Sequence, residues 1–262
     1  MRLLRHELKI NRKSFLIWTI SIAVFCVGCI LLYDSLEESV AQMAESYANM
    51  GAMSAAFGMD KLSLATMQGY YGTEIAMIFN LGAAMFAALL GIGMLSKEEN
   101  GHTAEFLNTL PVSRTRIFFE KYGGIILMLL IFNVIQIALN YLSVALMGDD
   151  MEADVFFMYH LASFIMQLEI ATICYMISAF SKRSLLGVGL GVAIGMYALD
   201  IMCRIIPAIE DAKYITPFYY CSAADIFTEV AINLELVAIG CMVSVACLLV
   251  GRYKYVTKDL AS

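Results

Sequence analysis

The chain has 262 residues, of which 61% are hydrophobic and 15% are charged, and its formal net charge is −6. Soluble globular domains are roughly 45–50% apolar and about 25% charged, and the mean hydropathy of this chain, +0.76, is also far to the apolar side. The composition excludes a soluble enzyme or binding module and predicts an integral membrane protein.

Apolar runs long enough to cross a membrane occur at six places in the sequence. A helix needs on the order of 20 apolar residues to span a hydrocarbon core about 30 Å thick, and none of the runs alternates like a barrel strand. The sequence therefore predicts one all-α transmembrane domain over residues 1–262, with six helices. The predicted spans are Ser14–Tyr33, Ile75–Leu95, Gly123–Met147, Phe156–Phe180, Leu185–Ile206 and Asn233–Gly251.

The basic residues predict which side of the membrane each loop faces. Lys and Arg in short loops favour the cytoplasmic side, and all of them except Lys61, Arg204 and Lys213 fall on the side that carries both termini. We therefore expect cytoplasmic N and C termini, with residues 34–74 and 207–232 outside. Acidic residues weigh little in this rule, so the net charge indicates no partner.

Three segments outside the spans have their own patterns. Residues 1–13 are basic and amphipathic, which predicts an interfacial helix on the membrane surface. The Ala-rich first half of 34–74 favours a helix that caps the outer surface. Within residues 207–232, Pro217 breaks any helix because proline keeps the preceding residue out of the helical region of backbone angles. We expect this stretch to dip back toward the membrane.

A charged, patterned stretch, Ser96–Lys121, separates the second and third spans. Thr103 is placed to cap a short helix, with Glu105 near its positive end. Pro111 ends that helix, and Ser113 is placed to cap a second helix that runs into the third span. The prediction is two short helical pieces joined at a proline corner on the cytoplasmic side.

The first of these pieces carries an apolar face. Phe106 and Leu110 share that face at i, i+4 spacing, with Leu107 beside them and charges around them. An apolar knob of this kind fits a groove in a soluble partner. The residues predicted to make this contact are Glu98, Glu99, Glu105, Phe106, Leu107, Leu110, Pro111, Arg114 and Arg116.

The loop EENGHTAEFLNTLPVSR, followed by Lys121, resembles the coupling region of permease subunits of type-2 ABC exporters. The basic N-terminal segment with Glu7, the six spans, Thr216-Pro217-Phe218 and Lys258 in the tail are similar too. The resemblance implies an export permease of the bacterial cytoplasmic membrane that dimerises with an identical or related permease. It also implies a separate cytoplasmic ABC ATPase that holds ATP and Mg, and the sequence agrees because it contains no G-x-x-x-x-G-K-[ST] phosphate loop.

Polar side chains inside spans are costly and therefore informative. Asn133, Gln136 and Asn140 make one stripe on the third span, and Glu169 lies near the middle of the fourth. We expect all four to face the bundle interior. They form either an interhelical hydrogen-bond network or part of a translocation path.

The fifth span holds two further patterns. Gly187, Gly191 and Gly195 share one face, a spacing that lets membrane helices approach closely, and they fit packing within the subunit or against a second permease. Near the outer end of this span, Asp200 and Arg204 are one turn apart, which predicts an ion pair at the membrane boundary.

Two other classes of function compete with the exporter. A secondary transporter would use Glu169 as a proton carrier, but the two halves of the chain are unequal. An intramembrane hydrolase would need paired catalytic groups; the chain has no H-E-x-x-H motif, and His102 and His160 have no companion ligands at metal spacing. We therefore expect no catalytic residue, metal site or cofactor on this chain, with ATP hydrolysis on the partner.

Overall fold

A computed structural model describes residues 2–101, 112–148, 151–183 and 185–258. Within these ranges every regular element is helical, so the predicted all-α class is confirmed. Six helices are long and apolar enough to cross a membrane, which confirms the predicted number of spans. These helices are α1 (Arg2–Ala48), α4 (Ala76–Asn100), α6 (Arg114–Met147), α7 (Ala153–Phe180), α8 (Leu186–Ile205) and α10 (Leu234–Thr257).

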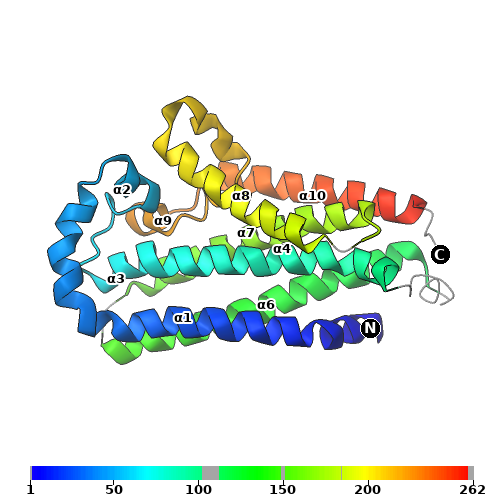
Figure 1. Cartoon of the computed structure of the whole chain (residues 1–262), viewed down its shortest axis with the longest axis horizontal. Helices are drawn as coiled ribbons and strands as arrows, with labels where there is room; N and C mark the ends of the chain where they lie inside the picture. The colour runs from blue at the N-terminus through cyan, green and yellow to red at the C-terminus, as the bar shows by residue number, and fades with distance from the viewer. Residues whose placement is uncertain (1, 102–111, 149–150, 184, 259–262) are drawn as a thin grey trace.

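The six long helices lie alongside one another, and both chain termini lie at the same end of the bundle (Figure 1). We call this the terminal end and the opposite one the far end. The assignment of the terminal end to the cytoplasm stays a prediction from the basic residues.

Helices α4 and α7 form the centre of the bundle. In the most apolar 18-residue stretch of each helix, 67% of the residues of α4 and 61% of those of α7 are buried. The corresponding share in the other four spans is between 22% and 39%. Small residues of α4 such as Ala84 and Ala88 are fully buried, and small residues let membrane helices approach closely. At Gly91 a Cβ would lie 2.2 Å from the carbonyl oxygen of Ala171, so only glycine permits this approach.

Helix α1 joins three segments that the sequence suggests as separate. Residues 1–13, expected as an interfacial helix, continue into the first span, and the helix extends beyond it to Ala48. Its 47 residues make it about 70 Å long, more than the hydrocarbon core requires. The last turns of α1 run across the far end of the bundle (Figure 1), so the first half of the outer loop is helical as an extension of the span.

Short elements cover the far end. The polypeptide after Pro217 turns back against the bundle, so that Phe218, Tyr220 and Cys221 are buried. The expectation that residues 207–232 dip back toward the membrane stays a prediction. The short elements are α2 (Ala52–Phe57), α3 (Met67–Tyr70), the π-helical turn η1 (Tyr71–Ile75), the 3-10 helix η2 (Pro207–Tyr214) and α9 (Ala223–Glu229).

Candidate functional site

The loop between α4 and α6 is described only at its two ends. The predicted partner contacts at Glu105, Phe106, Leu107, Leu110 and Pro111, and the side chain of Glu99, lie outside the described residues and stay predictions. The second predicted helix begins as expected. The Oγ atom of Ser113 accepts a hydrogen bond from the N–H of Arg116 at 3.3 Å, which confirms Ser113 as the N-cap of α6.

At the base of this loop lies a group of two lysines and two glutamates, of which one lysine and one glutamate are fully buried and the other two are partly exposed. The ammonium group of Lys121 on α6 donates to Glu7 of α1 at 2.9 Å and to the carbonyl oxygen of Met94 on α4 at 2.9 Å, and it also pairs with Glu98. Glu7 accepts a further bond from Lys97 of α4. We call Glu7, Lys97, Glu98 and Lys121 the basal charge cluster.

The basal charge cluster is stable only because its charges are paired. The side chains of Lys121 and Glu7 are 0% exposed, and an isolated buried charge costs many kcal/mol. Two positive and two negative groups cancel in the cluster, and the carbonyl of Met94 satisfies a further donor of Lys121. Both ends of the loop are therefore held to the N-terminal part of α1.

A second set of contacts joins the same loop to the C-terminal helix. The guanidinium of Arg114, at the start of α6, donates to the carbonyl oxygen of Lys258 at 2.7 Å. The ammonium of Lys258 in turn donates to the carbonyl oxygen of Ser181, between α7 and α8, at 2.7 Å. All the described helix ends near the loop are thus tied together.

The charged residues assigned to the partner contact fall into two groups. Glu98 and Arg114 bind other parts of this chain. Arg116 instead lies on the surface, where 65% of its side chain is exposed and it pairs with Glu120 at 2.8 Å. Of these three, Arg116 is the best placed to reach another protein.

The polar stripe of α6 is buried, and its members bind two different neighbours. Asn133 and Gln167 of α7 exchange two hydrogen bonds, of 2.7 and 3.1 Å. Gln136 donates to the carbonyl oxygen of Thr19 on α1 at 2.8 Å. Asn140 is 0% exposed, and neither atom of its amide has a partner among the described residues. The stripe therefore fastens α6 to α7 and α1, as an interhelical network does.

Glu169 is buried in a different place from the stripe. Its carboxylate accepts a hydrogen bond from the hydroxyl of Tyr220 at 3.0 Å, and no hydrogen bond joins it to the stripe within the described chain. It also faces Gly240 of α10, where a Cβ would lie 2.2 Å from the carboxylate oxygen. The four polar residues that the sequence groups together thus belong to two sites.

The three-glycine face of α8 is open in this subunit. Gly187, Gly191 and Gly195 are exposed, and a Cβ added to any of them would meet nothing within 4 Å. By contrast, Gly189 faces inward, where a Cβ would lie 2.8 Å from Ile92 of α4. Of these four glycines of α8, it is therefore Gly189 that permits close packing inside the subunit.

The far end contains a second ionic group. The predicted pair is confirmed, with Arg204 Nε 3.2 Å from Asp200 Oδ1. The same guanidinium lies 3.0 Å from Asp225 of α9, and Lys61 approaches the other oxygen of Asp225 at 2.6 Å. We call Lys61, Asp200, Arg204 and Asp225 the far-end charge cluster. A short-range sequence pattern could not have predicted that Lys61 and Asp225 belong to this cluster, because both are distant in sequence from Arg204.

Ion pairing shifts the pKa values of Lys61 and Asp225, the two members of the far-end charge cluster that lie outside the spanning helices. Burial raises the pKa of Asp225, but Arg204 and the hydrogen bond from Lys61 lower it more, so this pKa lies below its ordinary value. The pKa of Lys61 is raised, first by its hydrogen bond to Asp225 and despite partial burial. Both shifts favour the charged forms.

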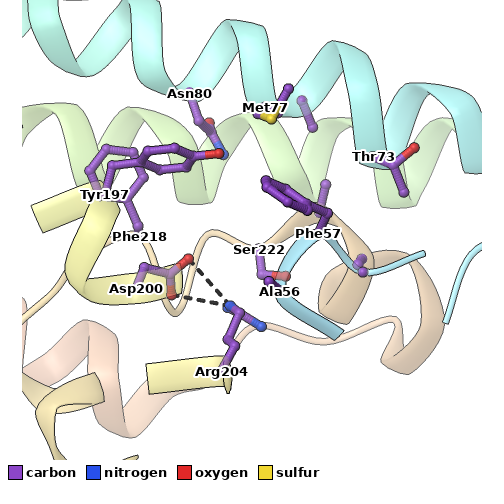
Figure 2. A pocket seen from close by; sticks show the side chains of 15 residues that line it. Ala56, Phe57, Thr73, Met77, Asn80, Tyr197, Asp200, Arg204, Phe218 and Ser222 are labelled. Atoms are coloured by element: carbon purple, nitrogen blue, oxygen red, sulfur yellow. Dashed lines mark hydrogen bonds and ion pairs between the residues drawn. The ribbon is translucent and has the colours of Figure 1, made fainter. Parts of the chain in front are cut away.

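A small cavity of about 60 Å³ adjoins the far-end charge cluster. Figure 2 shows the Asp200–Arg204 pair on one side of this cavity, with Asn80 of α4 and Thr73 of η1 on the other and Phe57 between them. This space admits a few water molecules but is too small for a drug-sized ligand. We assign it no ligand.

His160 is buried among aromatic side chains. Its ring lies 4.5 Å from that of Phe156 and 5.0 Å from that of Phe79, centroid to centroid. Its Nε2 shares a hydrogen bond with the hydroxyl of Tyr71 at 3.0 Å. This histidine is therefore part of the aromatic packing between α4 and α7.

Six apolar spanning helices around a mainly apolar core with some buried polar side chains define a multi-pass α-helical membrane protein. The model of a family described as ABC-2 family transporter protein matches residues 1–260, so the chain belongs to the ABC-2 transporter family. It is a permease, the membrane component of an ABC transporter, and not its catalytic subunit. This confirms the family resemblance of the sequence. A comparison with curated proteins gives no match.

Proposed function

We propose that this chain is the permease subunit of an ATP-driven exporter in the bacterial cytoplasmic membrane. In this proposal a separate ABC ATPase binds ATP and Mg, and a second, identical or related permease completes the translocation path. The main support is the basal charge cluster, which joins both ends of the loop 96–121 to α1.

The mechanism follows from the way in which the loop is held. The apolar residues Phe106, Leu107 and Leu110 sit in a groove of the ATPase, and Arg116 at the surface helps to orient them. Because Glu98 and Lys121 are paired in a buried cluster, the two loop ends do not move independently. Movement of the loop is therefore passed to α1, α4 and α6 together.

The outer surfaces of α1 and α8 support contact with a second permease. The glycine face of α8 is open, and α1 exposes large apolar side chains, including Ile17 at 64% and Phe25 at 64%. Small residues on one helix allow a partner helix to approach closely. The cargo path lies between the two permeases in this proposal, with the buried polar residues Asn133 and Glu169 supporting its walls.

The deciding experiment is co-purification of the tagged permease with its ATPase. Phe106→Asp places a charge in the proposed apolar contact and is expected to reduce the recovered ATPase at least tenfold. Met53→Asp is the matched control, since Met53 lies on α2 at the far end and is 51% exposed. We expect this control to recover as much ATPase as the wild type.

Two results would contradict the proposal. If the wild-type chain recovers no ABC ATPase from its own cells, the coupling to ATP is wrong. If Phe106→Asp retains the ATPase in full stoichiometry, the apolar contact is misplaced. Transport that continues on a proton gradient after nucleotide depletion would instead favour the secondary transporter.

A further inference from the structure

A second and larger cavity, of about 340 Å³, opens at the far end among η2, α9 and the start of α10. Its volume falls in the range of small-molecule sites, which is about 300–1,000 Å³. Three tyrosines, Tyr214, Tyr219 and Tyr220, are among its lining residues, together with charged groups of both signs. The question is which charge a ligand would need in this cavity.

The three cations that line the cavity are already neutralised. Each lies in an ion pair with a carboxylate of the same chain, so none is available to hold an anion. These pairs are Lys61–Asp225 at 2.6 Å, Arg204–Asp225 at 3.0 Å and Lys213–Glu210 at 2.9 Å.

Two carboxylates in the lining remain uncommitted. Glu229, at the end of α9, and Glu235, in the first turn of α10, both line the cavity. Both are exposed, and neither forms an ion pair within 4 Å among the described residues, although Glu229 lies near enough to Lys61 to contribute to the raised pKa of that lysine. The cavity therefore offers free negative charge and no free positive charge in its described lining.

The tyrosine rings add a surface that suits cations. The negative face of an aromatic ring attracts a cation within about 6 Å of its centroid. Two of these rings already do so in the structure, since the Arg204 guanidinium lies 4.4 Å from the ring centre of Tyr219 and the Lys213 ammonium 5.7 Å from that of Tyr214. Tyrosine also provides apolar area for the body of a ligand.

Tyr220 connects this cavity to a buried carboxylate. The residue lines the cavity, is only 4% exposed, and donates its hydroxyl to Glu169 at 3.0 Å. Glu169 is 5% exposed, and no ion pair to a cation is found for it among the described residues. A buried carboxyl without a counter-charge favours its neutral, protonated form, and a cation held against Tyr220 would favour the charged form.

We propose that this cavity binds organic cations that have an apolar body. Glu229 and Glu235 hold the positive charge at the opening, and the rings of Tyr219 and Tyr220 contact the apolar part, with Glu169 beneath them. The site is assigned to this chain alone. It requires neither ATP nor a partner subunit, and the ligand need not be the exported cargo.

The test uses tetraphenylphosphonium as the cation and tetraphenylborate as an anion of the same shape. Binding to the full chain in nanodiscs is measured by equilibrium dialysis without nucleotide, after subtraction of binding to protein-free nanodiscs. We expect saturable binding of the cation and none of the anion. The double variant Glu229→Gln/Glu235→Gln should raise the Kd for the cation at least tenfold.

The matched control is Glu38→Gln/Glu45→Gln. It removes the same two charges from exposed positions of α1 outside the cavity, so it should leave the Kd within twofold. Equal weakening in both double variants would mean diffuse surface attraction and would overturn the site. Absence of saturable cation binding, or equal binding of the borate, would overturn it as well. Neither outcome affects co-purification with the ATPase, so the two proposals fail separately.

Discussion

At the terminal end Lys121 and Glu7 are fully buried, whereas at the far end Lys61 keeps 42% of its side chain exposed and Asp225 keeps 22%. The basal charge cluster joins three long helices, α1, α4 and α6. The far-end charge cluster joins α8 to the short α9 and to the turn that contains Lys61. The most buried pair of the chain thus lies in the basal charge cluster and the more exposed pair in the far-end charge cluster, while Glu98 at 17% and Arg204 at 11% are intermediate.

The difference bears on what each cluster can do. Water cannot replace a lost partner in the basal charge cluster, so its charges are held as a unit. At the far end water can replace part of a lost partner in the outer Lys61–Asp225 pair, so this pair is weaker and exchangeable, whereas Asp200 and Arg204 are only 10% and 11% exposed. A rigid cluster suits the transmission of movement from the loop, and an exchangeable one suits the wall of a binding cavity.

The largest expected effect is at Lys121. Lys121→Met leaves Glu7 and Glu98 without their shared cation, and breaking a buried ion pair in this way costs about 3–5 kcal/mol. The free energy of unfolding in detergent measures this loss. Lys182→Met, which removes an exposed lysine at the same end, is the control. Equal stability of the two variants would show that the basal charge cluster does not hold the helices.

A smaller loss is expected at Arg204. Its side chain is 11% exposed, and Arg204→Met removes charged hydrogen bonds to Asp200 and Asp225 worth about 1.5–3 kcal/mol. Arg204→Lys should recover only part of this, because lysine cannot bind two carboxylates with a planar fork. The same unfolding measurement applies. A loss larger than that of Lys121→Met would reverse the ranking of the two clusters.

The smallest effect is the acid dependence of the far end. A carboxyl whose folded pKa is lowered stabilises the fold above its unfolded pKa, and this contribution is lost as the pH falls through the folded pKa. For Asp225 the ordinary value is 3.8. The melting-temperature difference between wild type and Asp225→Asn should therefore be constant at neutral and mildly acidic pH and shrink below about pH 4. A difference unchanged at about pH 3 would contradict the ion pairing of Asp225.

Local spacing predicted several features of the molecule correctly. The Asp200–Arg204 pair and the Ser113 cap lie within one helical turn of their partners, so each follows from a few neighbouring residues. The same holds for the number of spans, because hydrocarbon requires a continuous apolar run. The polar residues of α6 were also expected in the interior, where they are found.

Other features depend on helix packing and lay beyond local patterns. Lys121 binds Glu7 across 114 residues, and Lys61 binds Asp225 across 164. Periodicity describes one helix at a time and contains no information on which helices meet. For the same reason Glu169 was grouped with the stripe of α6, although the orientation of α7 turns it toward Tyr220 and Gly240.

The sequence by itself determined that this protein has six membrane spans with a polar loop after the second, since hydropathy and short-range spacing are local properties. Only the tertiary structure decided that Glu98 and Lys121 close the loop base onto α1, and that Tyr220 lies between an open cavity and Glu169. The physical reason is that buried charges and polar groups require partners, and packing of distant helices decides which groups can meet.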